Sequence, residues 1–382
     1  MTTTILKKKP GTAGLAAVLL FALAGAITAA AAESPAFLKG KVRDASAGAA
    51  SGLALEKRIE QARADAVRQG GGTAFFAAYE FTSRTRVHSG RYIGPAGGYA
   101  VGSKDARIRI EDKARGTKSV SVDGEEADAP APAGLLLLFD PAQGPGVRDA
   151  SLLDPDQAYE FAETPVYWLG RADGADAVGY LDKAFDGVKD DMHLLDALIF
   201  AVACHDAPQA RAFLKKTALG PREPKVREKA VFWIGNAGDA AAVADLKEIY
   251  AKEKSDAVKK QIIFAFQLAK PKEAAEELIR IAKLDASPEL RKQAVFWLGQ
   301  KATAECVKAL KDIADAPDGE RALKEQAVFA ISQLPKEKSV PMLIDLARDN
   351  KSLDVRKKAI FWLGQSGDPA ALKFFEDILL KK

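Results

Sequence analysis

The tripeptide Cys204-His205-Asp206 is where side chains that could do chemistry stand together in this sequence. A thiol beside an imidazole and a carboxylate is the set of groups that an activated nucleophile needs. The segment "DAPQA" follows directly, over residues 206–210. A helix that ends here, with Asp206 as a cap before Ala-Pro, explains the same residues more simply. We therefore interpret the tripeptide as a helix boundary and not as a catalytic site.

Other residues with catalytic or metal-binding potential are few. The chain has three histidines, His88, His193 and His205, and none is followed by Glu. It lacks the spacing of a zinc site, a phosphate-binding loop and a nucleophile elbow. The glycines of residues 90–102, "GRYIGPAGGYAVG", have no strand-loop-helix context and indicate a hairpin or loop. The sequence thus predicts no catalytic residue, no metal site and no cofactor.

The first 32 residues have the pattern of a secretory signal peptide. Lys7, Lys8 and Lys9 precede an uncharged stretch that ends in three alanines before Glu33. An uncleaved anchor helix is the alternative, although the stretch is short and weakly apolar for a span. We expect cleavage, export to the periplasm or medium, and no membrane span afterwards. Removal of this segment lowers the formal charge from +4 to +1, which gives no reason to expect nucleic acid as a partner.

The composition changes along the remaining chain. Residues 33–72 suggest a flexible leader followed by one helix over residues 53–68. Four segments with alternating or short apolar runs predict strands, and they define a small β-rich module from 73 to 150: 74–83, 106–112, 117–123 and 134–140. From about residue 160 the helical period takes over. With 382 residues, the chain has room for such a division.

A repeat with an aromatic anchor dominates the helical part. The sequence holds "AVFWIGN" at 230–236, "AVFWLGQ" at 294–300 and "AIFWLGQ" at 359–365, with weaker copies between them. The anchoring aromatics lie 32 or 33 residues apart: Tyr167, Phe200, Phe232, Phe264, Phe296, Phe329 and Phe361. A fixed spacing over seven copies is the signature of a repeat protein.

Each period also contains a second, amphipathic helix. Examples are residues 240–252, 272–284, 340–349 and 370–380. Two antiparallel helices in about 32 residues form the unit of an α-solenoid, in which stacking provides the core. We expect about six helical hairpins over 160–382, opened by a lone helix at Thr164-Pro165 and closed by a lone helix at 369–382.

The aromatic helices open with "KVREKA" (225–230), "ELRKQA" (289–294) and "DVRKKA" (354–359). This pattern resembles the bacterial HEAT-like repeat of the phycobilisome-lyase type. The resemblance implies that the aromatic helices line the concave face of the superhelix. It also implies that a basic residue five positions before the aromatic ties neighbouring repeats through carboxylates. An anion-binding role for that basic residue is the alternative.

On a helical wheel, the aliphatic positions face the partner helix and the aromatic lies on the opposite side. Polar residues surround it one turn before and one turn after. The predicted contact surface for a partner is the following set: Phe232, Phe264, Phe296, Phe329, Phe361, Gln300, Gln333, Gln365, Lys260, Lys292 and Lys357. Apolar side chains with a polar rim suit a protein interface. The alternative is that neighbouring helices bury these rings between them.

The position after the aromatic alternates between Trp and Ala through Trp168, Ala201, Trp233, Ala265, Trp297, Ala330 and Trp362. We interpret each Trp as a wedge over the Ala of the next repeat, with the nearby Gly giving room. A ligand-binding Trp is the alternative. Cys204 and Cys306 lie about three repeats apart, too far for a disulfide, whose Cα atoms must be within about 7 Å.

These patterns favour an exported, non-catalytic scaffold that binds a protein or peptide of the cell envelope. Two enzymatic readings attach to the repeat family. A di-iron hydroxylase of this class needs His-Glu pairs, which the three histidines do not supply. Lyase chemistry has only the repeat in common with this chain, and export disfavours it. A divergent lyase or oxidoreductase and a purely structural envelope protein stay as alternatives.

Overall fold

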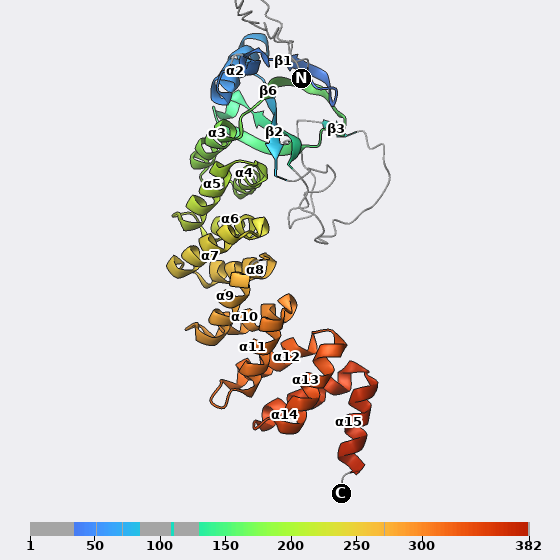
Figure 1. Ribbon diagram of the computed structural model, residues 1–382. Coiled ribbons are helices and arrows are strands. Elements are labelled where there is room, and N and C mark those ends of the chain that lie inside the picture. Colours follow the sequence, from blue (N-terminus) through green and yellow to red (C-terminus); the bar gives the residue numbers. More distant parts are fainter. Residues whose placement is uncertain are drawn as a thin grey trace, which may run out of the picture.

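The computed structural model describes residues 34–50, 52–70, 72–84, 108–110, 130–270 and 272–380. It joins a six-stranded sheet to a long column of paired helices (Figure 1). The expected fold class, an α-solenoid with a β-rich N-terminal part, is therefore confirmed. The expected signal peptide and the expected strand at 117–123 lie outside the described residues. None of the helices in the described ranges has the length and apolar character needed to cross a bilayer.

The sheet has the order β1-β6-β2-β4-β5, and β3 pairs with β6 off this path. Its strands are β1 (Leu38–Asp44), β2 (Phe75–Ser83), β3 (Ile108–Ile110), β4 (Ala131–Phe139), β5 (Val147–Leu153) and β6 (Tyr159–Arg171). A short α1 (Ala47–Ala50), the longer α2 (Leu55–Gly70) and a 3-10 turn η1 (Pro141–Gln143) connect them. β1 and β2 both run parallel to β6, one on each side, so α2 carries the chain across that strand. Parallel neighbours require such a crossover helix.

The predicted flexible leader was wrong, because residues 38–44 form strand β1. This strand pairs with β6 in parallel register, with Leu38 opposite Tyr159 and Asp44 opposite Trp168. "LKGKVRD" carries few apolar residues and an exposed outer row, so it has little hydrophobic pattern. An edge strand is held by its backbone hydrogen bonds, which leave no trace in the sequence.

The predicted lone helix at Thr164-Pro165 was also wrong, because these residues belong to β6. Both faces of β6 are buried, with Val166 and Trp168 on one side and Tyr167 and Leu169 on the other. A short apolar run of this kind fits a doubly buried strand or a helix equally well. Pro165 lies within an irregularity, where the register jumps from Phe161 to Val166 opposite β1, and so takes no regular ladder position.

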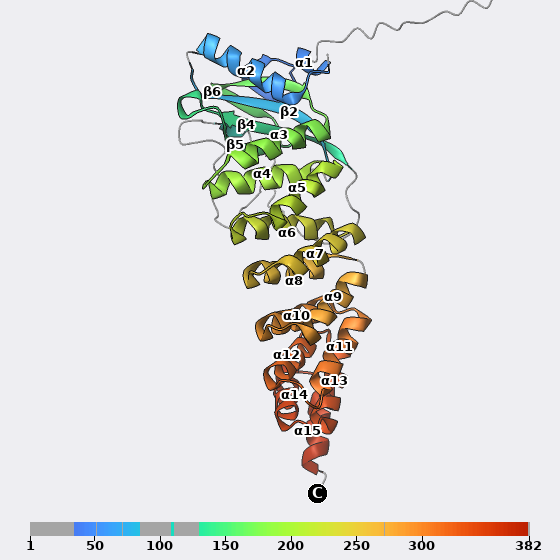
Figure 2. The same cartoon turned by 90° about the vertical axis from the view of Figure 1, so that its left-hand side faces the viewer.

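Six hairpins and one further helix follow the sheet, and they form two parallel columns in Figures 1 and 2. The odd column comprises α3 (Gly174–Gly187), α5 (Pro208–Leu219), α7 (Ala240–Lys252), α9 (Lys272–Leu284), α11 (Ala304–Asp315), α13 (Lys336–Asp349) and α15 (Pro369–Leu380). The even column comprises α4 (Met192–Cys204), α6 (Pro224–Ala237), α8 (Asp256–Leu268), α10 (Pro288–Lys301), α12 (Arg321–Ser332) and α14 (Leu353–Ser366), and contains the aromatic helices.

Local signals set the ends of the helices. Gly238 takes φ +66 after α6, a left-handed conformation that glycine adopts without strain. Asp239 then caps α7 by accepting a 2.6 Å hydrogen bond from the backbone N–H of Ala242. Pro224 and Pro288 occupy the first turns of α6 and α10, where a missing N–H costs nothing. The two-residue turn at 238–239 therefore reverses the chain between two columns.

One continuous apolar core runs through the molecule. It begins on the face of the sheet that α2 covers, passes through α3 and α4, and continues to Phe374 in α15. A second, smaller core of buried residues lies on the opposite face of the sheet, around Phe76, Phe161 and Trp168. The sheet therefore closes the first hairpin of the solenoid, which would otherwise expose its apolar end.

His205 fixes the junction between sheet and solenoid. It is fully buried, its ring stacks on Phe81 at 3.8 Å, and its Nδ1 donates to the carbonyl oxygen of Ala201 at 2.7 Å. With that proton on Nδ1, Nε2 is the acceptor, and it lies 3.4 Å from the hydroxyl of Tyr79. The backbones also meet, since the N–H of Asp206 donates to the Thr82 carbonyl oxygen at 2.9 Å. Burial lowers the pKa of His205 to about 4, so the ring is neutral at pH 7.

Two glycines let neighbouring even helices approach closely. A Cβ built on Gly235 of α6 would lie 2.5 Å from the Cβ of Ala265 in α8. A Cβ on Gly299 of α10 would lie 3.0 Å from the Cβ of Ala330 in α12. These spacings leave no room for a methyl group, so the glycines are required by packing.

Acidification should weaken the junction through His205. Its folded pKa of about 4 is below the ordinary value of 6.5, so the unfolded state binds more protons between these two pH values. The stability is complete above pH 6.5 and falls as the pH drops towards 4, by about 3 kcal/mol. Urea unfolding followed by circular dichroism between pH 7.5 and 4 measures this loss. His205→Gln should remove this part of the pH dependence.

His193→Gln is the matched control, because His193 lies exposed on the same helix, α4. The His193→Gln variant should keep the loss of stability that His205 causes on acidification. A His205→Gln protein that loses as much stability as the wild type over this pH range would contradict the assignment.

The glycine contacts predict opposite effects for one substitution at two places. Gly235→Ala should destabilise the fold by about 1–3 kcal/mol, because the new methyl meets both Cβ and Cα of Ala265. Gly364→Ala in α14 should stabilise it by about 0.5–1 kcal/mol, since nothing lies within 4 Å of a Cβ there and Ala favours helix. Thermal and urea unfolding compare the two. The double variant Gly235→Ala/Ala265→Gly should recover most of the lost free energy of unfolding. A double variant as unstable as Gly235→Ala would contradict the packing explanation.

Candidate functional site

The predicted contact surface lies along the even column, where aromatic rings form a ladder. The rings of Phe232 and Phe264 stack across α6 and α8, with centroids 6.4 Å apart and an interplanar angle of 8°. Phe–Trp pairs join the remaining neighbours of the even column. Phe200–Trp233 lies between α4 and α6 at 5.0 Å, Phe264–Trp297 between α8 and α10 at 4.9 Å, and Phe329–Trp362 between α12 and α14 at 5.3 Å. Each Trp also contacts the Phe beside it in its own helix, at 4.9–5.1 Å. The ladder therefore holds its rings in fixed positions.

These contacts change the interpretation of the tryptophans. The sequence predicted a Trp wedge over the Ala of the next repeat. In the structure, Trp297 contacts Phe264 of the preceding repeat, while Gly299 accommodates Ala330 of the next one. Two interfaces thus alternate along the even column, one aromatic and one formed by Gly against Ala. Trp168 takes no part, because it lies in β6 and its ring contacts Phe37 at 6.1 Å.

The rings of the ladder are neither fully packed nor fully free. Phe232, Phe264, Phe296 and Phe329 are partly buried. Phe361 in α14 is 53% exposed. Inter-repeat packing and a surface-exposed edge therefore coexist on the same rings, so the two readings of the column do not exclude each other.

Most of the polar residues predicted around the rings are exposed, and one forms an ion pair. Gln300, Gln333 and Gln365 are exposed, each one helical turn after its phenylalanine. Lys260 and Lys357 are exposed one turn before it. Lys292 is partly buried and forms an ion pair of 2.5 Å with Glu289 in its own helix. Five of the six predicted polar residues are thus exposed at equivalent positions of the even helices, and Leu268 stands in place of an amide in α8.

The basic residues five positions before the ring serve structure. Arg227 pairs with Glu253 at 3.0 Å, and Arg291 pairs with Glu320 at 2.6 Å. Glu253 lies in the turn between α7 and α8, and Glu320 directly precedes α12, so each pair ties two repeats. Arg356 instead donates to the carbonyl oxygen of Asn350 at 2.8 Å. The inter-repeat role that the resemblance implied is confirmed for Arg227 and Arg291.

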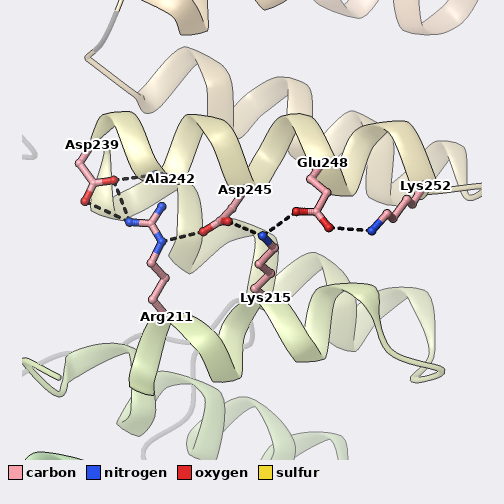
Figure 3. Close-up of polar contacts among 7 residues, drawn as sticks. All are labelled: Arg211, Lys215, Asp239, Ala242, Asp245, Glu248 and Lys252. Carbon is pink, nitrogen blue, oxygen red and sulfur yellow. Dashed lines mark hydrogen bonds and ion pairs between the residues drawn. The ribbon is translucent and has the colours of Figure 1, made fainter. Parts of the chain in front are cut away.

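Ion pairs also connect the helices of the odd column, a feature that the sequence reasoning missed. Figure 3 shows the best-defined set, between α5 and α7. Arg211 contacts Asp245 at 2.6 Å and Asp239 at 3.1 Å, and Lys215 contacts Asp245 at 2.8 Å and Glu248 at 2.6 Å. Lys247–Glu277, Lys283–Asp312 and Lys311–Asp345 continue the pattern along the column. The sequence carries a signal for these ion pairs, because a basic residue in one repeat is followed by an acidic residue about 30 positions later.

A shallow hollow of about 420 Å³ opens between α11 and α13 in the odd column. Ala304, Val307 and Met342 line it, together with Lys308, Lys311 and Lys338. It lies away from the aromatic ladder and includes none of the predicted contact residues. Sequence periodicity gives no warning of such a hollow, because it depends on how far two helices diverge.

The residues with catalytic potential are engaged in structure. Burial raises the pKa of the Cys204 thiol to about 12, so it carries its proton at neutral pH and is a poor nucleophile. Cys306 is buried, and both thiols are free, as expected. Within the described residues, no group of three His, Cys, Asp or Glu side chains is placed to hold a metal ion.

Two family models match segments of the helical column. Residues 316–382 match the model described as HEAT repeats. Residues 226–251 match the model described as PBS lyase HEAT-like repeat. A search of curated proteins finds no match to the sequence.

A comparison with solved structures matches human deoxyhypusine hydroxylase in complex with glycerol, at 21% identity and a TM-score of 0.24, covering 54% of this chain and 79% of that one. The YIBA protein of E. coli has 19% identity and a TM-score of 0.33, and the match covers 55% of this chain and 77% of that one. A computationally designed cyclic homo-oligomer has 17% identity and a TM-score of 0.12, covering 54% and 71%. None of these likenesses says anything of this chain's activity. The repeat motifs and the stacked hairpins agree with the two family models, so residues 226–251 and 316–382 are similar to HEAT-like repeats within an α-solenoid.

Proposed function

We propose that the protein is an exported, non-catalytic scaffold that binds an extended segment of a cell-envelope protein along the even column. The observation that carries this proposal is the partly exposed aromatic ladder. Its rings are fixed by contacts with one another, as in the Phe264–Trp297 pair. Binding to rings that are already immobile costs little side-chain entropy, and aromatic anchors contribute most of the energy in many interfaces.

The polar residues beside the rings favour an extended partner. Packed helices lie about 8–10 Å apart, and an extended chain advances about 3.3 Å per residue. One repeat therefore matches about three residues of an extended segment. The exposed amides of Asn236, Gln300, Gln333 and Gln365 recur at this spacing, except at α8. A side-chain amide offers both a donor and an acceptor, which is what a peptide backbone needs.

The charges along the even column favour a protein partner over nucleic acid. The residues four positions before the rings have mixed signs in the order Glu228, Lys260, Lys292, Glu325 and Lys357. Mixed signs give no continuous positive surface, which binding to a phosphate backbone requires. They suit a partner segment that itself carries both charges, with the aromatic rings between them.

A triple substitution tests the binding surface. Phe296→Ala/Gln300→Ala/Gln333→Ala removes one ring and two amides, and Phe296 contacts Trp297 of its own helix, so the helix column should persist. Crosslinking and pull-down from the envelope fraction should recover the partner with the wild type and at least about tenfold less with the variant. Circular dichroism checks that the variant is folded.

Leu284→Ser is the matched control, because Leu284 is a 75% exposed apolar residue in the odd column. It should recover the partner as the wild type does. An equal yield from the folded triple variant would exclude the ladder as the contact surface. A chromophoric or metal cofactor that co-purifies with the protein would instead favour the enzymatic alternative.

Export predicts a defined mature N-terminus. Cleavage after the alanines at 30–32 should leave Glu33 as the first residue. Intact mass and N-terminal sequencing of the protein from the envelope fraction measure this directly. A chain that still carries Lys7–Lys9 and stays with the membrane after a high-salt wash would contradict cleavage and indicate an anchor.

A further inference from the structure

The outer face of α14 leaves uncovered three positions that the earlier repeats bury or enclose. Ile360 is 40% exposed, whereas its equivalents Val231 and Val295 are fully buried. Gly364 is exposed, whereas its equivalents Gly235 and Gly299 are buried. Phe361 is the most exposed ring of the aromatic ladder. We call Ile360, Phe361 and Gly364 the α14 end face.

The earlier repeats show what covers such a face. In α6 and in α10 the same positions are covered by the next even helix, which presents an alanine at the closest approach. Ala265 of α8 fills this role against Gly235, and Ala330 of α12 fills it against Gly299. Apart from the nearby backbone of α14 itself, nothing in the described chain lies within 4 Å of a Cβ built on Gly364.

Apolar exposure is concentrated at this end of the molecule. The described residues include ten exposed large apolar side chains, and seven of them lie on α14 and α15: Leu353, Ile360, Phe361, Leu372, Ile378, Leu379 and Leu380. A gathering of this kind marks an interaction surface more often than scattered apolar residues do.

We propose that the α14 end face docks an amphipathic helix of another protein, which presents an alanine to Gly364 as Ala265 and Ala330 do inside the solenoid. The docked helix continues the even column by one step. Its apolar residues cover Ile360 and Phe361, and its small residue lets the two backbones approach.

The repeat pattern argues against a second copy as the occupant. In a second copy, the helices with alanine at this position are α4, α8 and α12, and their alanines Ala201, Ala265 and Ala330 are already buried within that copy. Its uncovered even helix is α14, which carries Trp362 at that position. The earlier repeats pair Trp with the phenylalanine of a helix that has no such glycine, as in Phe264–Trp297. A helix from a different protein satisfies both requirements.

A peptide with the sequence of α12 provides a probe of known geometry. Residues 319–335 are synthesised with Arg321→Lys and a lactam to Glu325, because this pair already lies one turn apart on the exposed side at 2.8 Å. The lactam is needed since short helices are marginal in water. Fluorescence anisotropy with the full chain should give a Kd below about 100 µM.

Gly364→Leu should weaken binding at least about tenfold, because Leu fills the space for the alanine while favouring helix.

Two controls make the result specific. The same peptide with Ala330→Trp should bind at least about tenfold more weakly, since Trp cannot approach Gly364. The Gln300→Ala/Gln333→Ala protein should bind the peptide as the wild type does, which separates this face from the binding surface proposed above. Absence of peptide binding, or binding that Gly364→Leu leaves unchanged, would overturn the proposal. So would a concentration-dependent dimer that Gly364→Leu converts to monomer in analytical ultracentrifugation, because the face would then belong to a second copy.

Discussion

The contact of Gly235 with Ala265 is the constraint on which the even column depends. It brings two helix backbones so close that neither can carry a larger residue at that point. The next interface along the column is of the opposite kind, a Phe–Trp pair between α8 and α10. A small-small contact and a large-large contact then follow each other regularly. This alternation explains why the sequence repeats most strongly every two hairpins, although each hairpin is itself a unit.

The division of charge between the columns follows from the same architecture. Acids and bases of the odd column face one another across repeats, as Lys215 faces Asp245 and Glu248. Such partly exposed pairs add only a few tenths of a kcal/mol each, so they align the helices more than they stabilise them. The even column also pairs acids with bases between repeats, as in Arg227–Glu253, but it adds aromatic rings and exposed amides at its surface. The rings and amides therefore distinguish the even column from the odd one.

The sequence could predict the hairpins because their signal is periodic. Phe264 and Phe296 stand in matching positions of two repeats, and the helices around them begin and end at Pro, Asp and Gly residues that favour helix ends. The same logic failed at Tyr167, which lies at the repeat spacing but within a strand. The four consecutive apolar residues at 166–169 fit a helix or a strand equally well. Pairing with β1 and β2, which are distant in sequence, makes them a strand. β1 escaped prediction for a related reason, since its place at the sheet edge depends on backbone pairing with β6.

The candidate site could be predicted only as a set of positions. A helical wheel placed Phe296 and Gln300 away from the hairpin core, and in the structure Phe296 is partly buried and Gln300 is exposed. The helical wheel could not show which neighbouring repeat Trp297 contacts, because that depends on the angle between successive hairpins. Since Trp297 leans back onto Phe264, the space beside Gly299 is left for the next helix. Each even helix with Trp thus packs its Trp against the preceding even helix and its Gly against the following one. In α14, Trp362 has its neighbour, whereas no following helix packs against Gly364. The repeat unit therefore specifies both how the column is built and what kind of helix could extend it.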